Sequence, residues 1–285
     1  GVRMAGLAHG GHAPVLITFM MGVSSIIVGT LIDPLSGLIP LFGILCIMAS
    51  AFLVNFWRDP DRPIPKQPGV LVSPADGHVM FIRRERATGR RPSKEAYASG
   101  DVEHDVLTGD WVAKACDNPL EFTTEQRFEA VEKGDESDED VIRMAIFMSP
   151  LDVHVNRSPM ASTIERMEHR TGKGMKRGPF KAAYKKESEF NERVRTVFLN
   201  DDGHRIEVTQ ISGALARTIV PWQGIGDQLR RGQRFGMIRL GSRVDLRVPA
   251  VDFTTTVVSA EMKDVAHPKG QFVQAGTTVL FTPEA

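Results

Sequence analysis

Two apolar stretches near the N-terminus constrain the fold of this chain more than any other feature. They cover 13–32 and 38–56, and neither contains a charged residue. Each is about 20 residues long, the length that an α-helix needs to cross the roughly 30 Å hydrocarbon core of a bilayer. The intervening segment 33–37 holds aspartate, proline, serine and glycine, which are typical of a turn. The pattern therefore predicts a transmembrane helical hairpin.

Basic residues flank this hairpin on both sides. Arg3 precedes it, and Arg58, Arg62 and Lys66 follow it. By the positive-inside rule, both ends and the rest of the chain face the cytoplasm, so we expect a location at the cell membrane (the inner membrane where there are two). The alternative for the first stretch is a cleaved signal peptide. However, the apolar region of a signal peptide is shorter than this stretch, and a second apolar stretch would not follow it directly. We expect a membrane anchor over 1–57 and a separate domain over 58–285.

The rest of the chain consists mostly of short strand-like runs separated by turn residues. A short helix is expected over 212–220. The segment 270–280 resembles the closing hairpin of a lipoyl-like barrel. Strands are expected at 70–72, 78–82, 141–147, 164–170, 194–199, 205–211 and on both sides of 241–242. The predicted fold class is thus a mainly β (α+β) soluble domain with lipoyl-like, barrel-sandwich β elements, preceded by the hairpin.

Charge and cysteine content exclude several functions. The 35 basic residues balance the 35 acidic ones, which gives no argument for a nucleic-acid partner. Cys46 and Cys116 are too few for a disulfide framework. The histidines lack the spacing of metal ligands, so no metal site is expected.

The dipeptide Gly241-Ser242 lies between two runs of alternating apolar and polar residues. A turn is the ordinary interpretation of such a dipeptide. Self-cleavage is the alternative, because a serine hydroxyl can attack the carbonyl carbon of the preceding residue and glycine tolerates the strained geometry. Elimination of the resulting ester converts the serine into a pyruvoyl group at a new N-terminus. The surrounding motifs decide between the two interpretations.

Two further residues stand at turns where strands end, a common location for catalytic groups. Asp76 lies in a Pro-Ala-Asp-Gly turn, and His154 follows the strand predicted at 141–147. Taken singly, each is more commonly a hydrogen-bonded turn or loop residue. Together with Ser242 they supply a carboxylate, a base and a nucleophile. His78 is an auxiliary candidate because it follows Asp76 by two residues.

Taken in order, the motifs of this chain resemble the phosphatidylserine decarboxylase family in its short bacterial and archaeal form. The motifs are 58–60, 73–77, 148–154, 178–193, 232–237 and 241–242, and they extend over nearly the whole chain. The resemblance implies a pyruvoyl-dependent carboxy-lyase made as a zymogen. It would cut itself between Gly241 and Ser242 into a β chain, 1–241, and an α chain, 242–285, which stay together as a heterodimer.

The chain departs from the long form of that family at two positions. Arg243 follows the serine where the long form has threonine, and Arg157 stands where the long form has a second histidine. The resemblance carries the catalytic roles over to Asp76 and His154. It leaves open whether His154 serves both maturation and turnover or whether His78 or Arg157 assists.

The reaction implied by the resemblance converts phosphatidylserine in the membrane to phosphatidylethanolamine and CO2, a step of phospholipid biosynthesis. The pyruvoyl group from Ser242 would form a Schiff base with the substrate amine and take up the electrons released with CO2. His154 would protonate the resulting carbanion. The alternative is a membrane-anchored lipoyl-like binding or adaptor module without catalysis. The sequence does not fix whether the α–β pair assembles into a higher oligomer.

Overall fold

A computed structural model of the chain divides it into two compact units. The first comprises Gly1–Arg62 with Pro150–His154, and the second comprises Pro63–Ser149 with Val155–Ala285. Cys116 and most of the motif 178–193 lie outside the described residues. The structure describes residues 6–32, 37–86, 90–92, 94, 98, 102–104, 111–113, 130–133, 140–170, 191–213, 218–239, 241–257 and 270–284.

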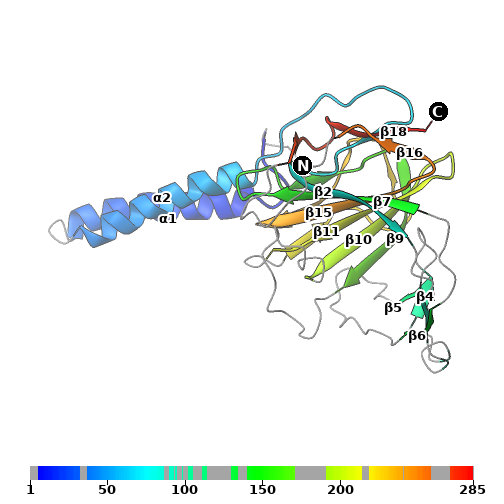
Figure 1. The fold of residues 1–285 in the computed structure, drawn as a ribbon. Coiled ribbons are helices and arrows are strands. Elements are labelled where there is room, and N and C mark those ends of the chain that lie inside the picture. The colour runs from blue at the N-terminus through cyan, green and yellow to red at the C-terminus, as the bar shows by residue number, and fades with distance from the viewer. Residues whose placement is uncertain are drawn as a thin grey trace. The chain divides into compact units, whose positions relative to one another are not determined.

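The first unit is built on the two helices that the sequence predicts, α1 (His12–Ile32) and α2 (Leu38–Phe56). They run antiparallel as a hairpin (Figure 1). Small residues allow the close approach: a Cβ added to Gly22 would lie 2.8 Å from the carbonyl oxygen of Gly43, and one added to Gly43 would lie 2.7 Å from that of Gly22. Such contacts between small residues are common where helices pack in membranes.

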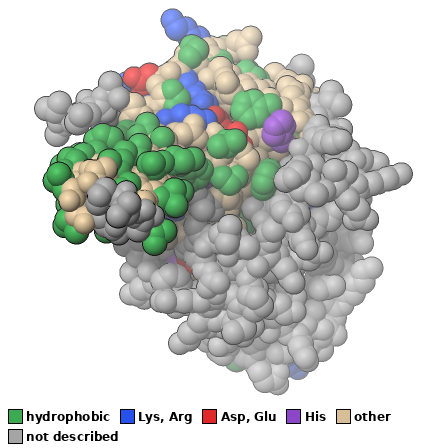
Figure 2. Space-filling model, turned by 90° about the vertical axis from the view of Figure 1, so that its left-hand side faces the viewer, with side chains coloured by type: hydrophobic (Ala, Val, Ile, Leu, Met, Phe, Trp, Pro, Cys, Tyr) green, Lys and Arg blue, Asp and Glu red, His purple; other side chains and the backbone are tan. Residues whose placement is uncertain are grey.

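The outward surface of this hairpin is hydrophobic (Figure 2). Both helices are long and apolar enough to cross a membrane. Large apolar side chains on a surface of this extent are expected to face lipid or another apolar partner. The exposed ones include Leu16, Ile17, Phe19, Met20, Leu41, Phe42, Leu45 and Met48.

The second unit is mainly β, as the sequence predicts. Its strands are β1 (Leu71–Val72), β2 (Gly77–Arg86), β3 (Arg90–Pro92), β4 (Val102–His104), β5 (Trp111–Ala113), β6 (Ala130–Lys133), β7 (Asp140–Met148), β8 (Val155–Arg157), β9 (Ser162–Arg170), β10 (Arg193–Leu199), β11 (Arg205–Ile211), β12 (Thr218–Pro221), β13 (Gln228–Leu229), β14 (Arg234–Arg239), β15 (Ser242–Pro249), β16 (Phe253–Thr255), β17 (Phe272–Val273) and β18 (Val279–Pro283).

These strands form one large sheet and several small ones. The large sheet has the order β13-β9-β10-β11-β15-β7-β2-β17. Two three-stranded sheets have the orders β1-β18-β16 and β12-β14-β8, and the pairs β3-β6 and β4-β5 complete the described strands. Strands β16 and β18 lie over one face of the large sheet (Figure 1).

The hydrophobic core contains residues of the large sheet and of both three-stranded sheets. Val244 and Leu246 of β15 and Ile146 of β7 belong to the same buried cluster as Leu71 of β1 and Phe281 of β18. Because side chains alternate along a strand, the other residues of β15 and β7 point to the opposite face. Among the residues that the structure describes, this core therefore lies against one face of the large sheet.

Two expectations about the second unit need correction or stay open. The helix expected over 212–220 is wrong for its last residues, because Thr218–Pro221 forms strand β12, paired with β14, and 214–217 lie outside the described residues. Threonine, isoleucine and valine in succession are β-branched, which favours the strand. β17 pairs with β2, and β18 with β1 and β16, so 270–280 is not a simple hairpin. The lipoyl-like arrangement stays a prediction.

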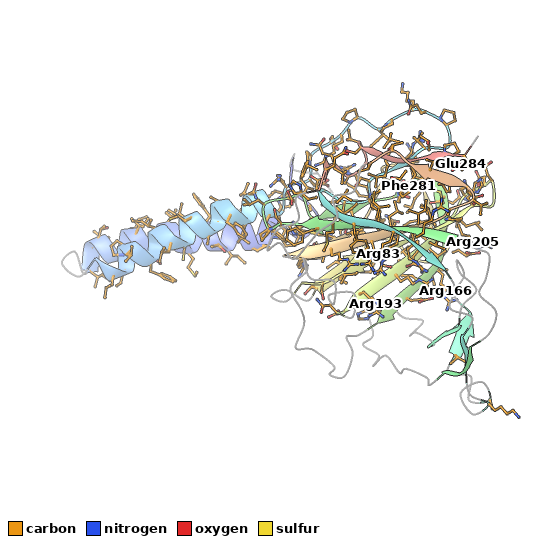
Figure 3. All side chains as sticks on the ribbon, in the orientation of Figure 1. Arg83, Arg166, Arg193, Arg205, Phe281 and Glu284 are labelled. Atoms are coloured by element: carbon orange, nitrogen blue, oxygen red, sulfur yellow. The ribbon has the colours of Figure 1, made fainter. Side chains whose placement is uncertain are left out.

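The opposite face of the large sheet carries charged side chains. In Figure 3 the labelled Arg83, Arg166 and Arg193 lie on the side of the sheet away from Phe281. On this face Asp245 forms ion pairs with Arg143 and Arg243, of which the pair with Arg243 is the more deeply buried. The Nε atoms of these arginines lie 2.7 and 2.5 Å from the Asp245 carboxylate oxygens. A second group of ion pairs comprises Glu168, Arg195, Glu207 and Arg247.

Asp245 is a buried carboxylate that pairs with two arginines of this face. Burial by itself would raise its pKa, but the charges of Arg143 and Arg243 and their hydrogen bonds outweigh burial and lower the pKa below its ordinary value. A lowered folded-state pKa stabilises the fold above the unfolded-state pKa of about 3.9. This contribution is lost as the pH falls through the lower folded-state value.

We expect Asp245→Asn to lower the free energy of unfolding by about 3–5 kcal/mol at pH 7, because it removes the counterion shared by the buried Arg243 and the partly buried Arg143. The variant should also lack the acid-dependent stability loss that Asp245 contributes below about pH 4. Thermal melting of the detergent-solubilised chain at pH 7 and at acid pH measures both effects. Asp201→Asn, at an exposed turn position, is the control. Equal melting temperatures of the two variants would contradict the prediction.

Candidate active site

The chain passes from one sheet to another at the Gly241-Ser242 junction. β14 ends in the sheet with β12 and β8, and β15 begins at Ser242 in the large sheet between β11 and β7. Gly241 has a φ of 67°, a left-handed conformation that side chains other than glycine adopt at a cost. A Cβ at this position would meet nothing within 4 Å. Glycine is therefore required here by the backbone conformation and not by lack of space.

The Ser242 side chain is fully buried at the end of the apolar face of the large sheet. Ser242 pairs with Met148 of β7, and its Oγ donates to the Met148 Sδ at 3.3 Å. A thioether sulfur is a weak acceptor. Transfer of the hydroxyl proton to a stronger base therefore breaks only a weak hydrogen bond.

Asp76 occupies the turn between β1 and β2 and is also buried. Its Oδ1 accepts a hydrogen bond of 2.8 Å from the backbone N–H of Ala275. The next residue, Gly77, begins β2, which pairs with β7 on the side away from β15. The Asp76 turn and Ser242 therefore lie at the same end of the sheet, on the two sides of β7. Their backbones are two strand spacings apart, roughly 10 Å.

His78 lies on the opposite face of the same sheet. It pairs with Phe147, which in turn pairs with Arg243, and directly paired residues share a face. Ser242 precedes Arg243 and so points the other way. The His78 Nδ1 donates to the carbonyl oxygen of Gly270 at 2.9 Å. The structure therefore directs His78 away from Ser242.

Arg157, at the position of the second histidine of the long form, is buried in β8. Its backbone N–H donates to the carbonyl oxygen of Pro74 at 2.9 Å, and its Nη1 donates to that of Gly232 at 3.1 Å. A Cβ added to Gly276 would lie 2.9 Å from its Cδ. A guanidinium stays protonated in proteins, so Arg157 cannot act as a base. Instead it contacts the turn that precedes Asp76 and the segment that contacts the Asp76 carboxylate.

The structure adds two buried amides that the sequence reasoning missed. Gln210 Nε2 donates to Asn156 Oδ1 at 2.8 Å, and Asn156 Nδ2 lies 3.4 Å from the Pro74 carbonyl oxygen and 3.9 Å from the Met148 Sδ. The pair therefore joins the Asp76 turn to the thioether that contacts Ser242. One signal was available: Gln210 interrupts the apolar side of the strand that contains Ile206 and Val208.

His154 belongs to the first unit, whereas Asp76 and Ser242 belong to the second. The Nδ1 of His154 lies 2.9 Å from the carbonyl oxygen of Asp152. A carbonyl can only accept, so Nδ1 carries the hydrogen and Nε2 of the neutral ring is the proton acceptor. The ring also packs against Phe56, with 4.5 Å between ring centroids. The loop thus fixes both the tautomer and the orientation of the imidazole.

Comparison with known proteins identifies the family. The sequence model described as phosphatidylserine decarboxylase matches residues 49–281. The phosphatidylserine decarboxylase proenzyme of Symbiobacterium thermophilum is 37% identical over 70% of this chain and 69% of its own length. That of Erythrobacter litoralis is 35% identical over 80% of this chain and 72% of its own. The putative archaetidylserine decarboxylase proenzyme of Methanopyrus kandleri is 32% identical, over 82% and 83%.

These matches extend over most of both chains, and the match to the family model includes the segments that contain Asp76, His154 and Ser242. The chain belongs to the phosphatidylserine decarboxylase family, whose members are carboxy-lyases. No solved structure matches the chain.

Proposed function

We propose that this chain is a self-processing phosphatidylserine decarboxylase, which converts phosphatidylserine to phosphatidylethanolamine and CO2. The observation that carries the proposal is the Gly241-Ser242 junction: a buried serine hydroxyl directly after a glycine in left-handed conformation, at the point where the chain changes sheets. Family membership supports it. The noncatalytic adaptor is not favoured, because a binding module needs neither this junction nor His154.

In the proposed maturation step, Ser242 Oγ attacks the carbonyl carbon of Gly241. The hydroxyl proton goes to a base and the peptide nitrogen leaves, which converts the amide into an ester. A base then removes the Cα proton of residue 242, which expels Gly241 as a carboxylate and leaves a dehydroalanine. This enamine tautomerises to an imine, and addition of water with loss of ammonia gives the pyruvoyl group. We assign Asp76 to this step, as the carboxylate that supports removal of the serine proton. We assign His78 no part in it, because its side chain points to the other face.

The sheet arrangement supports cleavage without unfolding. β15 has eight residue pairs with β7 and five with β11, while β14 stays paired with β12 and β8. A cut between Gly241 and Ser242 therefore breaks no strand pairing. The α chain, 242–285, would contribute β15, β16, β17 and β18 to sheets completed by the β chain, 1–241. We therefore propose that the two chains remain together as a heterodimer.

A pyruvoyl group at residue 242 would supply the carbonyl that binds the substrate amine and takes up the electron pair released with CO2. The buried end of β15 fits such a group, since it excludes bulk water from the residue at 242. We assign His154 the proton transfer to the substrate carbon. Its Nδ1 hydrogen is held by Asp152, so the proton to be transferred is carried on Nε2. Arg157 keeps the Asp76 turn in place through Pro74.

We propose that the hairpin anchors the enzyme in the membrane that holds its substrate. A phospholipid with two acyl chains stays in the bilayer, so an anchored enzyme meets it in the plane of the membrane. The basic residues Arg58, Arg62 and Lys66 after the second helix favour the cytoplasmic side of the cell membrane for the catalytic domain.

Turnover of defined lipids by the full chain tests this proposal. The purified wild-type protein in detergent should release CO2 from phosphatidylserine labelled at the serine carboxyl and form an equal amount of phosphatidylethanolamine. A serine-headed lipid with archaeal ether chains tests whether recognition depends on the head group alone, and free serine tests for a decarboxylase of soluble amino acids. If the folded, full-length protein forms neither product, the proposal is overturned.

A further inference from the structure

We propose that Phe56 and Arg58, at the end of the second membrane helix, act as positioning residues for His154. The inference rests on the proposed function, since it takes His154 as the group that transfers the proton. Its basis is that the loop Pro150–His154 belongs to the same compact unit as the hairpin. The anchor would then hold a catalytic group as well as tether the protein.

The Arg58 guanidinium connects the last turn of α2 to this loop. Its Nη1 donates to the backbone carbonyl oxygen of Asn55 at 2.9 Å and contacts the Asn55 side chain. Its Nη2 donates to the carbonyl oxygen of Leu151 at 2.6 Å. The guanidinium makes these contacts from two separate nitrogens held in one plane, a geometry that the single nitrogen of lysine, at the end of a flexible chain, does not reproduce. Arg58 therefore fixes the loop three residues before His154.

Phe56 fixes the imidazole ring itself. The two rings are 4.5 Å apart between centroids and tilted by 46°. Phe56 is in turn held by Trp57, at 5.8 Å and edge to face, and by Phe52, at 6.5 Å. It is buried, and so is His154. Together with the hydrogen bond from Nδ1 to Asp152, this packing restricts both the rotation and the tilt of the ring.

The N-terminal segment stabilises the same end of the hairpin. Ala8 N–H donates to the carbonyl oxygen of Trp57, and Asp59 N–H donates to that of Gly6, both at 2.7 Å. A Cβ on Gly11 would lie 2.8 Å from Trp57 side-chain atoms, so the chain before α1 packs tightly here. Phe56 and Arg58 are thus held in a rigid setting.

The position of Phe56, Arg58 and His154 relative to a bilayer follows from their location at the end of the apolar helix α2. Aromatic residues and an arginine at the end of an apolar helix lie at the membrane interface, where lipid head groups are. A histidine held on this helix end is kept at the depth of the serine head group. Leu151, in the same loop, is an apolar side chain with 65% of its surface exposed, which suits contact with that interface. The hydrophobic length of the anchor would thus set the height of His154 over the membrane.

Variants of the full chain in phosphatidylserine-containing vesicles test the inference. Phe56→Ala removes the contact with the imidazole ring. Arg58→Lys keeps the positive charge but removes the planar guanidinium that contacts both Asn55 and Leu151. We expect each to lower kcat per matured chain by about 10- to 100-fold, because a small displacement of a catalytic group has effects of this size. KM should change by less than about twofold, since the substrate-binding residues are not altered. Phe56→Leu, which keeps the bulk, should lie between Phe56→Ala and wild type.

Matched control variants distinguish an effect on the position of His154 from an effect on membrane anchoring. Phe42→Ala removes an exposed ring from the same helix, and Lys66→Gln removes an exposed charge after it; both should retain wild-type kcat. In a His154→Gln background, Phe56→Ala should cause little further loss, because its effect passes through the imidazole. A merely structural role would instead lower activity equally in both backgrounds.

The outcomes distinguish the inference from the proposed function. An inactive, uncut wild type contradicts the proposed function. An active wild type together with membrane-bound Phe56→Ala and Arg58→Lys variants of unchanged kcat overturns the inference alone. Flotation with vesicles and thermal melting verify that each variant is inserted and folded. If Phe56→Ala fails to fold, Phe56→Leu and Arg58→Lys decide, and unchanged kcat in both would reject the positioning role.

Discussion

Replacement of Ser242 by alanine is expected to leave the chain in one piece and to abolish decarboxylation. Alanine lacks the oxygen that attacks the Gly241 carbonyl, so neither the ester nor the pyruvoyl group can form. The loss should be complete, because no other group of the site supplies the electron sink. Intact mass measures the first effect. Wild type should yield two pieces, one ending at Gly241 and one beginning at residue 242, the latter lighter by one ammonia than a chain starting with serine.

A second buried serine of the same sheet provides the control for this prediction. Ser162 lies at the start of β9, and its hydroxyl contacts the Met160 carbonyl oxygen. Ser162→Ala should therefore be cut and active. Cleavage or turnover by Ser242→Ala would place the reactive residue elsewhere and would contradict both the processing and the decarboxylation mechanism.

The parts of the fold that the sequence predicted are those set by local pattern. The helices α1 and α2 follow from apolar stretches whose length matches a bilayer. The strands β10 and β11, expected at 194–199 and 205–211, follow from two alternating runs on either side of the turn residues Asn-Asp-Asp-Gly at 200–203. In each case the signal lies within one short stretch of the chain. Partners distant in sequence are not needed to recognise it.

Pairing between distant segments could not be predicted in the same way. β2 shows the difficulty at the site. Ile82 packs against the core, and strict alternation would place His78 on the same face. The register shifts between Val79 and Phe81, however, so His78 shares a face with Phe147 instead. One extra residue in a strand reverses the direction of every side chain beyond it.

The residues of the candidate site could be predicted from the sequence, but the contacts that hold His154 in place could not. Asp76, His154 and Ser242 are recognisable from the motifs around them, although their catalytic roles stay predictions. The grouping of His154 with the membrane hairpin depends on Arg58 and Phe56, about a hundred residues earlier in the chain. Nothing in the local sequence of the loop indicates these contacts, because they arise from tertiary packing.

Substitution of His154 by glutamine should have the second largest effect. Glutamine is close to histidine in size and can accept and donate hydrogen bonds, but it cannot carry a proton to the substrate carbon. General acid–base catalysis by one side chain contributes about 10²- to 10⁴-fold, so we expect kcat per matured chain to fall by that factor with KM nearly unchanged. His204→Gln is the control, since His204 is partly exposed and pairs with Asp252.

The same variant shows whether His154 acts in maturation, in turnover or in both. If His154→Gln is cut at the wild-type rate but turns over slowly, the imidazole serves turnover and removal of the serine proton depends on Asp76. If the variant stays uncut, His154 also serves maturation, and Nε2, the acceptor in the tautomer fixed by Asp152, is the base that takes the Ser242 proton. Time courses of cleavage by intact mass, together with product release by the matured fraction, separate these cases. A matured His154→Gln enzyme with wild-type kcat would remove the histidine from the mechanism, and the positioning role of Phe56 and Arg58 with it.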